Sequence, residues 1–178
     1  MKTKFNAEKS GPTFLVIGAQ KCGTTWLGKM LCQHPQVCGP AKKELHFFNK
    51  PENYQKGLKW YIRQFSTVPC AKATGEFTPN YFWTYDGNKT MCDQNILEDI
   101  PKLVHDFNPD MKLILLIRNP VNRAISAYYH HIRKGRISPH EKILDVKDIY
   151  GIQSMGLLLF SVTRSPRIKK WYGPSAAA

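Results

Sequence analysis

With 178 residues, of which 42% are hydrophobic and 12% aromatic, the chain has the composition of one moderately sized globular domain and is not a disordered basic tail. Lysine and arginine number 26 against 13 acidic residues, and the resulting formal net charge of +13 attracts polyanions, whether anionic glycans or nucleic acids. No segment has the roughly 18 consecutive apolar residues of a membrane span, and residues 1–13 lack the apolar core of a signal peptide.

The first predicted unit is a strand at 13–18, a turn with two glycines and a helix at 24–33. The apolar run of the strand is typical of a buried parallel strand, and Gly18 and Gly23 let the backbone turn tightly and approach a ligand. The helix presents free N–H groups and a positive dipole end to the turn, where Lys21 adds a full charge. The sequence therefore predicts a phosphate-binding site at this junction.

Two other interpretations stay open at this point. The spacing of the turn nearly matches the nucleotide-binding pattern G-x-x-x-x-G-K-[ST] of nucleotide kinases and NTPases, but Thr24 stands where that pattern has lysine. Such an enzyme also needs a metal-holding aspartate at the end of a neighbouring strand, where this chain has Arg118. A polyanion-binding module without catalysis would explain the positive charge alone.

The stretch after the first helix alternates short strands with helices. We expect a short strand at 36–38, one helix over 51–65 and another short strand at 71–75, followed by a loop at 76–82. Ahead of the longer helix, residues 42–48 read Lys-Lys-Glu-Leu-His-Phe-Phe. A carboxylate in such a segment can serve as a general base when partial burial raises its pKa, whereas the neighbouring lysines act in the opposite direction.

A second strand-to-helix junction follows later in the chain. An apolar helical stripe over 96–107 is interrupted or restarted at Pro101. The apolar run at 112–117 then predicts a fully buried strand. Asn119 is a good N-cap, and the proline directly after it is suited to the first helical position, so we expect a helix over 120–134.

The predicted helix at 120–134 has two different faces. Its polar face consists of Asn122, Arg123, Ser126 and His130, and its apolar face consists of Ala124, Ile125, Tyr128 and Ile132. The alternation of strands with helices along the chain predicts an α/β fold, in which a parallel sheet is flanked by helices on both faces. In such a fold the ligand-bearing loops lie at the carboxyl ends of the strands.

Four segments of the sequence carry motif-like patterns. Residues 21–27 read Lys-Cys-Gly-Thr-Thr-Trp-Leu, and residues 42–48 contain K-E-x-x-F-F. Residues 118–128 follow R-x-P-x-x-R-x-x-S-x-Y at every fixed position, and residues 76–82 follow E-K-[ST]-P-x-Y-F with Phe77 in place of the lysine. Together these segments resemble sulfotransferases that use 3′-phosphoadenosine-5′-phosphosulfate (PAPS), particularly the heparan sulfate N- and 3-O-sulfotransferase branch. The resemblance implies their P-loop-NTPase-like α/β fold, here incomplete.

The resemblance also implies roles for individual residues. Glu44 would be the general base that takes the acceptor's proton, His46 an auxiliary acid or base, and Lys21 the cation that neutralises the departing 5′-phosphate oxygen. The residues that would bind PAPS are Lys21, Cys22, Gly23, Thr24, Thr25 and Trp26 at the 5′-phosphosulfate, and Arg118 and Ser126 at the 3′-phosphate. The implied in-line sulfuryl transfer requires no metal ion, and the sequence has neither C-x-x-C nor H-E-x-x-H.

The implied acceptor is a carbohydrate, such as an anionic glycosaminoglycan, or another compound with a hydroxyl or amine; no specific nucleic-acid partner is expected. Five cysteines, an odd number without metal-like pairing, leave at least one thiol free or bonded to another chain. Asn88-Lys89-Thr90 is a glycosylation sequon that matters only in the secretory pathway. The compartment cannot be read from the cysteines; the resemblance implies the Golgi lumen if the chain is part of an anchored eukaryotic protein, and we expect the cytoplasm otherwise.

The expected domain layout has a disordered N-terminal segment at 1–12, a partial sulfotransferase domain at 13–160 and a divergent, poorly ordered basic tail at 161–178. The resemblance fails after about residue 156, and the later strand and Lys-Gly-Arg cofactor loop of the family are absent. Residues 134–136 hold the same tripeptide, but they follow a predicted helix directly and are expected to end it. We therefore predict a truncated or alternatively terminated sulfotransferase with an incomplete cofactor lid.

Overall fold

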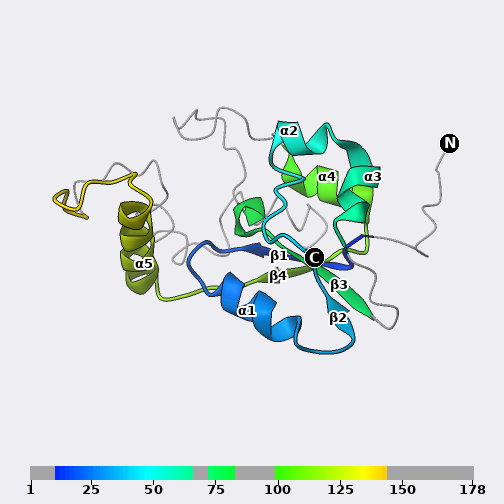
Figure 1. The fold of residues 1–178 in the computed structure, drawn as a ribbon, viewed down its shortest axis with the longest axis horizontal. Coiled ribbons are helices and arrows are strands. Elements are labelled where there is room, and N and C mark those ends of the chain that lie inside the picture. Colours follow the sequence, from blue (N-terminus) through cyan, green and yellow to red (C-terminus); the bar gives the residue numbers. More distant parts are fainter. Residues whose placement is uncertain (1–10, 66–71, 83–98, 144–178) are drawn as a thin grey trace, which may run out of the picture.

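The computed structural model describes residues 11–65, 72–82 and 99–143, and its centre is a four-stranded parallel sheet (Figure 1). The strands are β1 (Phe14–Gly18), β2 (Val37–Cys38), β3 (Ala73–Phe77) and β4 (Lys112–Leu115). Their order is β2-β3-β1-β4, with β1 paired to both β3 and β4. Because the strands are parallel, the segments that follow β1, β3 and β4 emerge at the same edge of the sheet.

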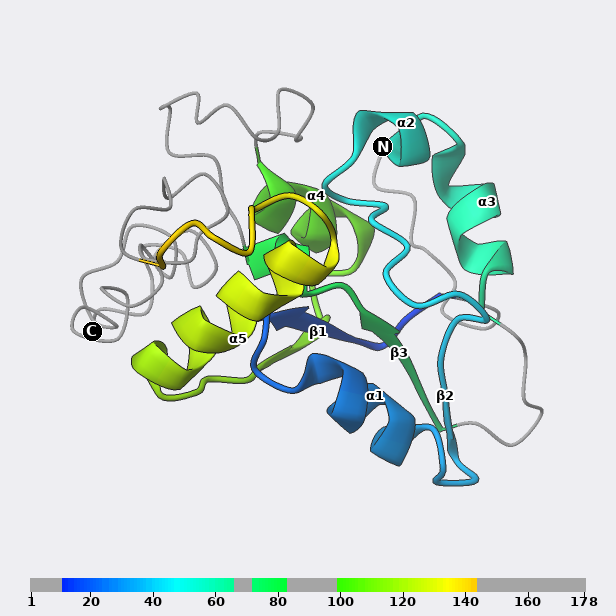
Figure 2. The ribbon, with the colours of Figure 1, turned by 60° about the vertical axis from the view of Figure 1, so that its left-hand side comes forward.

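Helices lie on both faces of the sheet, as Figures 1 and 2 show. One face carries α1 (Thr24–Leu31), and the other carries α2 (Pro51–Tyr54), α3 (Gly57–Arg63) and α4 (Ile100–Phe107). The short 3-10 helix η1 (Pro79–Phe82) follows β3, and α5 (Pro120–Arg133) lies beyond the carboxyl ends of the strands. The predicted α/β architecture, a parallel sheet with helices on both sides, is confirmed.

Two hydrophobic clusters hold the helices to the sheet, because successive residues of β1 point to opposite faces. The cluster on the side of α3 and α4 contains Leu15, Ile17, Phe47, Phe48, Tyr61, Tyr81, Ile100 and Val104. The cluster on the α1 side contains Phe14, Val16 and Phe77, with Leu27 and Leu31 packed against it. Phe47 stacks on Tyr61 with the ring centroids 4.2 Å apart. The core therefore anchors the segment that carries Glu44 and His46.

One predicted helix is two helices in the structure. We expected a single helix over 51–65, whereas α2 ends at Tyr54 and α3 begins at Gly57. Gly57 has a φ of +78°, a left-handed conformation that a continuous right-handed helix cannot contain. Tyr61 on α3 is fully buried, whereas Tyr54 on α2 and Leu58 on α3 are 37% and 39% exposed.

Two other boundaries differ from the prediction. The strand expected at 71–75 extends to Phe77, because the last residues of β3 pair with β1. The segment 76–82, expected as a loop, therefore begins on the strand. The helix expected at 24–33 ends at Leu31, with Cys32 as its C-cap.

The structure corrects the prediction that the run at 112–117 is a fully buried strand. Leu115 is 37% exposed and Ile117 is 66% exposed. Within the described part of the chain, β4 lies at the end of the strand order and pairs with β1, so no described strand covers its other edge. An apolar run by itself cannot distinguish a central strand from an edge strand.

Both later helices begin where the sequence signals placed them. The carboxylate of Asp99 accepts a hydrogen bond from the amide of Lys102 at 3.1 Å, and Pro101 lies in the first turn of α4. Pro101 thus lies at a helix start, while residues 96–98 of the predicted stripe lie outside the described ranges. Before α5, the side chain of Asn119 accepts from two backbone amides of the first turn, at 3.1 and 3.2 Å. The helix ends, as predicted, just before Gly135, whose φ is +66°.

The buried face of α5 differs from the one expected. Arg123, predicted on the polar face, is 2% exposed, and Ile125, predicted on the apolar face, is 41% exposed. The buried residues of the helix are Arg123, Ala127 and His131, at four-residue spacing. Ala127 packs against Ile137 in the segment that follows the helix, a tertiary contact that the helical period alone does not reveal.

Several expectations concern residues outside the described ranges: those on 1–10, on the sequon at 88–90, on Cys70 and Cys92 and on the stretch from 144 to the C-terminus. Cys22, Cys32 and Cys38 are free thiols. Among the helices of the described residues, none has the length and apolar character needed to cross a membrane.

Candidate active site

The turn between β1 and α1 leaves the start of a helix without a side-chain cap. Gly23 is the N-cap of α1, and its φ is +89°. A Cβ at this position would meet nothing within 4 Å, so glycine is needed here for its backbone conformation rather than for space. The N–H groups of the first turn carry the positive end of the helix dipole. Lys21, half-buried in the same turn, adds its ammonium group.

The second strand-to-helix junction meets the first. Arg118, just beyond β4, donates from Nη1 to the carbonyl oxygen of Lys21 at 3.3 Å, although 97 positions separate the two residues. The pKa of Lys21 is lowered, first by burial and then by the charges of Arg133, Lys43 and Arg118. Cations from three separate segments therefore gather around one turn, and an anion bound among them would relieve their repulsion.

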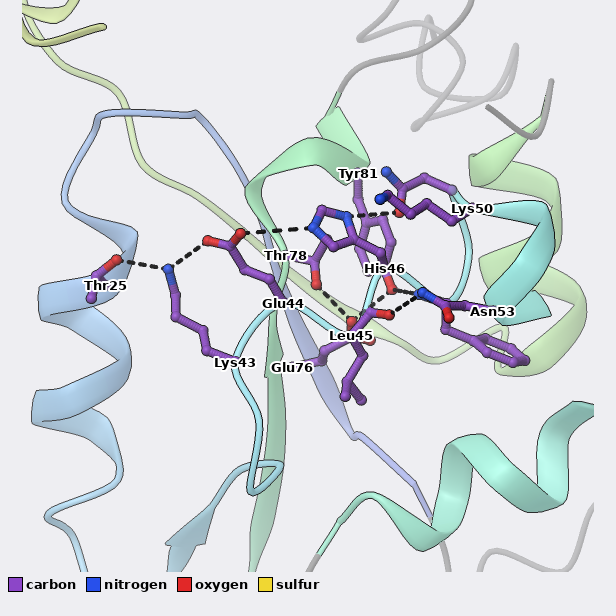
Figure 3. A network of polar contacts seen from close by, with 12 residues as sticks. Thr25, Lys43, Glu44, Leu45, His46, Lys50, Asn53, Glu76, Thr78 and Tyr81 are labelled. Atoms are coloured by element: carbon purple, nitrogen blue, oxygen red, sulfur yellow. Dashed lines mark hydrogen bonds and ion pairs between the residues drawn. The ribbon is translucent and has the colours of Figure 1, made fainter. Parts of the chain in front are cut away.

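A third segment reaches the same turn, as Figure 3 shows. Lys43 donates from Nζ to Oγ1 of Thr25 at 2.7 Å and to Oε1 of Glu44 at 2.8 Å. Nε2 of His46 lies 3.7 Å from Oε2 of Glu44, a distance for an ion pair rather than a hydrogen bond. Glu44 thus has an ammonium group on one oxygen and an imidazole near the other, and Lys43 connects it to the start of α1.

The environment of Glu44 lowers its pKa, whereas a general base would profit from a raised one. The pKa falls to about 2: interaction with His46 contributes most, burial acts in the opposite direction, and Lys43 adds to the lowering. At 3.7 Å the pull of His46 acts through charge and requires its protonated form, while the Lys43 ammonium is in direct contact. Glu44 is therefore a carboxylate at neutral pH, but a weak base while both neighbours are in place.

The three residues expected to be catalytic share an unusual backbone conformation. Among the described residues, the non-glycine positions with positive φ are Lys21, Glu44 and His46, at 66°, 61° and 53°. This left-handed region is unfavourable for residues that have a Cβ, and such residues concentrate at functional sites. The conformation must be maintained by contacts of the surrounding chain.

Behind this segment, Glu76 on β3 is a buried carboxylate with 1% exposure. It accepts hydrogen bonds from the hydroxyl groups of Tyr61, Thr78 and Tyr81, the last two at 2.7 and 2.6 Å. The pKa of Glu76 is raised, because burial outweighs the effect of these hydrogen bonds. Glu76 is thus a polar centre enclosed by the core.

The hydroxyl network also holds the Glu44–His46 segment in place. While donating to Glu76, the hydroxyl of Tyr81 accepts hydrogen bonds from the backbone amides of the two phenylalanines after His46, at 2.9 and 3.3 Å. Asn53 donates from Nδ2 to the carbonyl oxygen of Leu45 at 2.9 Å. These bonds fix the backbone on both sides of His46, and so support its left-handed conformation.

The other predicted cofactor residues are distributed around α1 and α5. Cys22 is half-buried, and burial raises the pKa of its thiol. Thr24 is buried, whereas Trp26 on α1 is 66% exposed. Ser126 lies in the second turn of α5, and no contact that the structure describes joins it to Arg118. No group of three or more His, Cys, Asp and Glu within the described ranges could hold a metal ion.

Sequence reasoning missed two features of this region. It presented Lys43 as a neighbour that lowers the pKa of Glu44, without the contact to Thr25. It also placed Glu76 in a loop, although the alternation of side chains along a strand could have located it. Phe77 packs edge-on against Phe14 on the α1 side, with 5.9 Å between the ring centroids, so the preceding carboxylate must point into the opposite core. Phe77 adds no charge to the site.

Comparison with known proteins identifies relatives of this arrangement. A family model described as a sulfotransferase domain matches residues 11–160. Heparan sulfate glucosamine 3-O-sulfotransferase 5 of Mus musculus is 36% identical over 117 residues, which cover 66% of this chain and 30% of that protein. The membrane-associated sulfotransferase kil1 of Dictyostelium discoideum is 36% identical over 125 residues, 68% of this chain and 23% of that protein. The chain therefore spans less than a third of the length of these curated relatives.

Two further matches extend the comparison. The bifunctional heparan sulfate N-deacetylase/N-sulfotransferase 3 of Mus musculus is 37% identical over 127 residues, 67% of this chain and 13% of that protein. Among solved structures, the sulfotransferase from Alicyclobacillus acidocaldarius aligns with a TM-score of 0.65 at 27% identity, covering 92% of this chain and 70% of that chain. The residues matched by the family model include all three segments that meet at Lys21.

Proposed function

Because the chain belongs to the sulfotransferase family, we propose that it transfers a sulfuryl group from PAPS to a hydroxyl or amine of a carbohydrate acceptor. The observation that carries the proposal is the hydrogen bond from Arg118 to the carbonyl oxygen of Lys21. It brings the two predicted phosphate-binding junctions to one place. A donor with phosphates on both its 5′ and 3′ sides requires two anion sites side by side. A single phosphate-binding loop could bind only one of these phosphates.

At the donor end, the proposal assigns complementary tasks to the two junctions. Lys21 and the N–H groups at the start of α1 would bind the 5′-phosphate and neutralise the charge that develops on its bridging oxygen. Arg118 and Ser126 would bind the 3′-phosphate, with the planar guanidinium bonding two phosphate oxygens at once. The like charges gathered around Lys21 support this assignment, since they favour a bound anion.

At the acceptor end, Glu44 would take the proton of the attacking group. Its low pKa keeps it ionised at neutral pH, and its side chain is 39% exposed, so an acceptor can reach it. His46, 3.7 Å away, would orient the carboxylate and stabilise its charge. Positioning of acceptor and donor in line would supply much of the remaining rate enhancement.

An anionic carbohydrate fits the charge of the chain best. The formal net charge of +13 and the cations around Lys21 favour polyanions in general. Two of the relatives carry heparan sulfate in their names, which supports a glycosaminoglycan over a small phenol or steroid. No specific nucleic-acid partner is part of the proposal.

The test is a transfer assay on the full chain with radiolabelled PAPS. The acceptors are heparosan, N-desulfated heparin and p-nitrophenol, and we expect label in the polysaccharides. Calorimetry with the desulfated product, adenosine 3′,5′-bisphosphate, tests the donor site separately. Absence of both transfer and binding would overturn the proposal, and magnesium-dependent loss of ATP would favour a nucleotide kinase.

A further inference from the structure

We propose that Lys43 is a catalytic lysine whose ammonium group leaves Glu44 and contacts the sulfuryl oxygens during transfer, while it keeps its contact with Thr25. This role rests on the proposed function of the same site and adds a residue to it. The motif comparison assigns Lys43 no role.

The position of Lys43 is the first argument. Its Nζ lies 2.7 Å from Oγ1 of Thr25 and 2.8 Å from Oε1 of Glu44 (Figure 3). Thr25 lies at the start of α1, where the leaving phosphate would bind, and Glu44 would contact the acceptor. A group in transit from donor to acceptor must pass between these two residues, and Lys43 already spans that gap.

The available hydrogen bonds are the second argument. An ammonium group has three N–H donors, and the described contacts of Lys43 use two of them. The side chain is 32% exposed, so a ligand can reach it. When a sulfuryl group enters, Lys43 can retain the Thr25 contact and exchange the Glu44 contact for sulfuryl oxygens.

The distribution of charge is the third argument. Lys21 feels the positive charges of Arg133, Lys43 and Arg118, each of which lowers its pKa. The donor brings negative charge to both its phosphate and sulfuryl ends, so a second cation near the sulfuryl end would add to its stabilisation. Lys21 is placed for the phosphate end, and Lys43, next to Glu44, is placed for the sulfuryl end.

The transfer step then balances as follows. The bond between sulfur and the bridging oxygen of the 5′-phosphate breaks, and its electron pair stays on that oxygen beside Lys21. A bond forms between sulfur and the acceptor oxygen or nitrogen, and the acceptor proton passes to Glu44. Lys43 keeps all its protons and donates hydrogen bonds to the sulfuryl oxygens. The products are the sulfated acceptor and adenosine 3′,5′-bisphosphate.

The exchange of partners also strengthens the base. In the free protein, contact with Lys43 contributes to the low pKa of Glu44. When the ammonium group turns to the sulfuryl oxygens, that contribution weakens and the pKa of Glu44 rises. Glu44 then becomes a better proton acceptor at the time when the donor is in place.

The test compares Lys43→Met with Lys42→Met in the full chain. Lys42 is the exposed neighbour of Lys43 in sequence, so this control removes the same charge from the same segment. We expect Lys43→Met to lower kcat by about 10²-fold, as expected for loss of one preorganised donor, and Lys42→Met to leave it unchanged. Binding of adenosine 3′,5′-bisphosphate should weaken by about threefold in Lys43→Met, far less than kcat falls, because one cation near Lys21 is lost but this product has no sulfuryl group.

Each outcome decides between specific alternatives. If Lys43 only ties its segment to α1, Lys43→Met will weaken bisphosphate binding by about the same factor as it lowers kcat and will lower the melting temperature, and the proposal fails. Equal kcat in wild type and Lys43→Met also overturns it, while the proposed function stands. If the wild type neither transfers sulfuryl groups nor binds the bisphosphate, the proposed function fails and the role of Lys43 falls with it. Lys43→Arg, which keeps the charge, should recover part of kcat.

Discussion

Glu44 and Glu76 show two ways in which this fold accommodates a carboxylate. Glu44 has a side chain that is 39% exposed, lies against Lys43 and His46, and has a pKa of about 2. Glu76 is 1% exposed, accepts hydrogen bonds from three neutral hydroxyl groups, and has a raised pKa. Charged partners keep the first carboxylate ionised and accessible, whereas neutral donors enclose the second.

The difference suits two tasks, chemistry for Glu44 and positioning for Glu76. The two residues are also connected, because Tyr81 donates to Glu76 and accepts from the backbone just after His46. Loss of Glu76 should therefore disturb the segment that carries Glu44, while loss of the Glu44 charge should leave the buried network intact. Variants of the two residues can separate these effects.

The largest effect is expected for Glu44→Gln. Without a proton acceptor, kcat should fall by about 10²- to 10⁴-fold, while the melting temperature falls only slightly, because solvent screening weakens the ion pairs of this partly exposed side chain. Initial rates of sulfuryl transfer and thermal unfolding measure the two quantities. Glu52→Gln is the matched control, since Glu52 is an exposed glutamate on α2 whose Oε1 lies 3.8 Å from Nζ of Lys50. A Glu44→Gln enzyme with full activity would show that another group accepts the proton.

The next effect is a loss of stability in Glu76→Gln. The amide NH₂ of glutamine would face hydroxyl groups that already donate, and a buried donor without an acceptor costs about 1–3 kcal/mol in the free energy of unfolding. Urea unfolding measures this loss, with Glu52→Gln again as control. The variant should also lose some activity, because the added NH₂ group faces a Tyr61 or Tyr81 hydroxyl that already donates and so disturbs the network that holds the segment after His46. An unchanged unfolding midpoint would contradict the anchoring role of Glu76.

Local signals in the sequence were sufficient for much of the fold. The proline and asparagine that start α5 act within one turn, and β1 is apolar at most of its positions because both its faces are covered. The partial exposure of β4 and the helix break at Gly57 could not be predicted from such local signals. Exposure of β4 depends on which strands flank it, and the positive φ of Gly57 depends on how two short helices dock onto the core.

For the candidate site, too, local motifs were predictable from the sequence and tertiary contacts were not. The sulfotransferase family and its heparan sulfate branch were predicted from short motifs, and the comparisons confirm them. The roles assigned to Lys21, Glu44 and His46 remain predictions, although the structure brings these residues to one place. The contact of Lys43 with Thr25 is a tertiary feature, so no spacing within the chain encodes it, whereas the alternation of side chains along β3 could have indicated the burial of Glu76.

The pH dependence of stability should have opposite signs for the two glutamates. The pKa of Glu44 lies at about 2 in the fold against an ordinary 4.5, so its ionised form stabilises the protein above pH 4.5, and this contribution is lost as the pH falls toward 2. Glu76 has a raised pKa, so the fold retains its proton longer, and its contribution declines as the pH rises above the ordinary value.

Urea unfolding midpoints measured across this pH range test both signs. Glu44→Gln should flatten the fall of stability on the acid side, and Glu76→Gln should flatten the decline at higher pH. Solvent screening will make the effect of Glu44 smaller than its pKa alone implies, because its side chain is more than a third exposed. Identical pH profiles for both variants would contradict the contrast between the two sites.

The smallest effect is expected for His46→Gln. His46 is too far from Glu44 for a hydrogen bond, at 3.7 Å, and a partly exposed ion pair contributes about 1 kcal/mol at most, so kcat/KM should fall by about fivefold. His105→Gln on α4, an exposed position, is the control. A loss as large as that of Glu44→Gln would assign proton transfer to His46 itself. A small loss of kcat/KM would mean that Glu44 is the base. The left-handed backbone of His46 would then serve to orient its imidazole toward the Glu44 carboxylate.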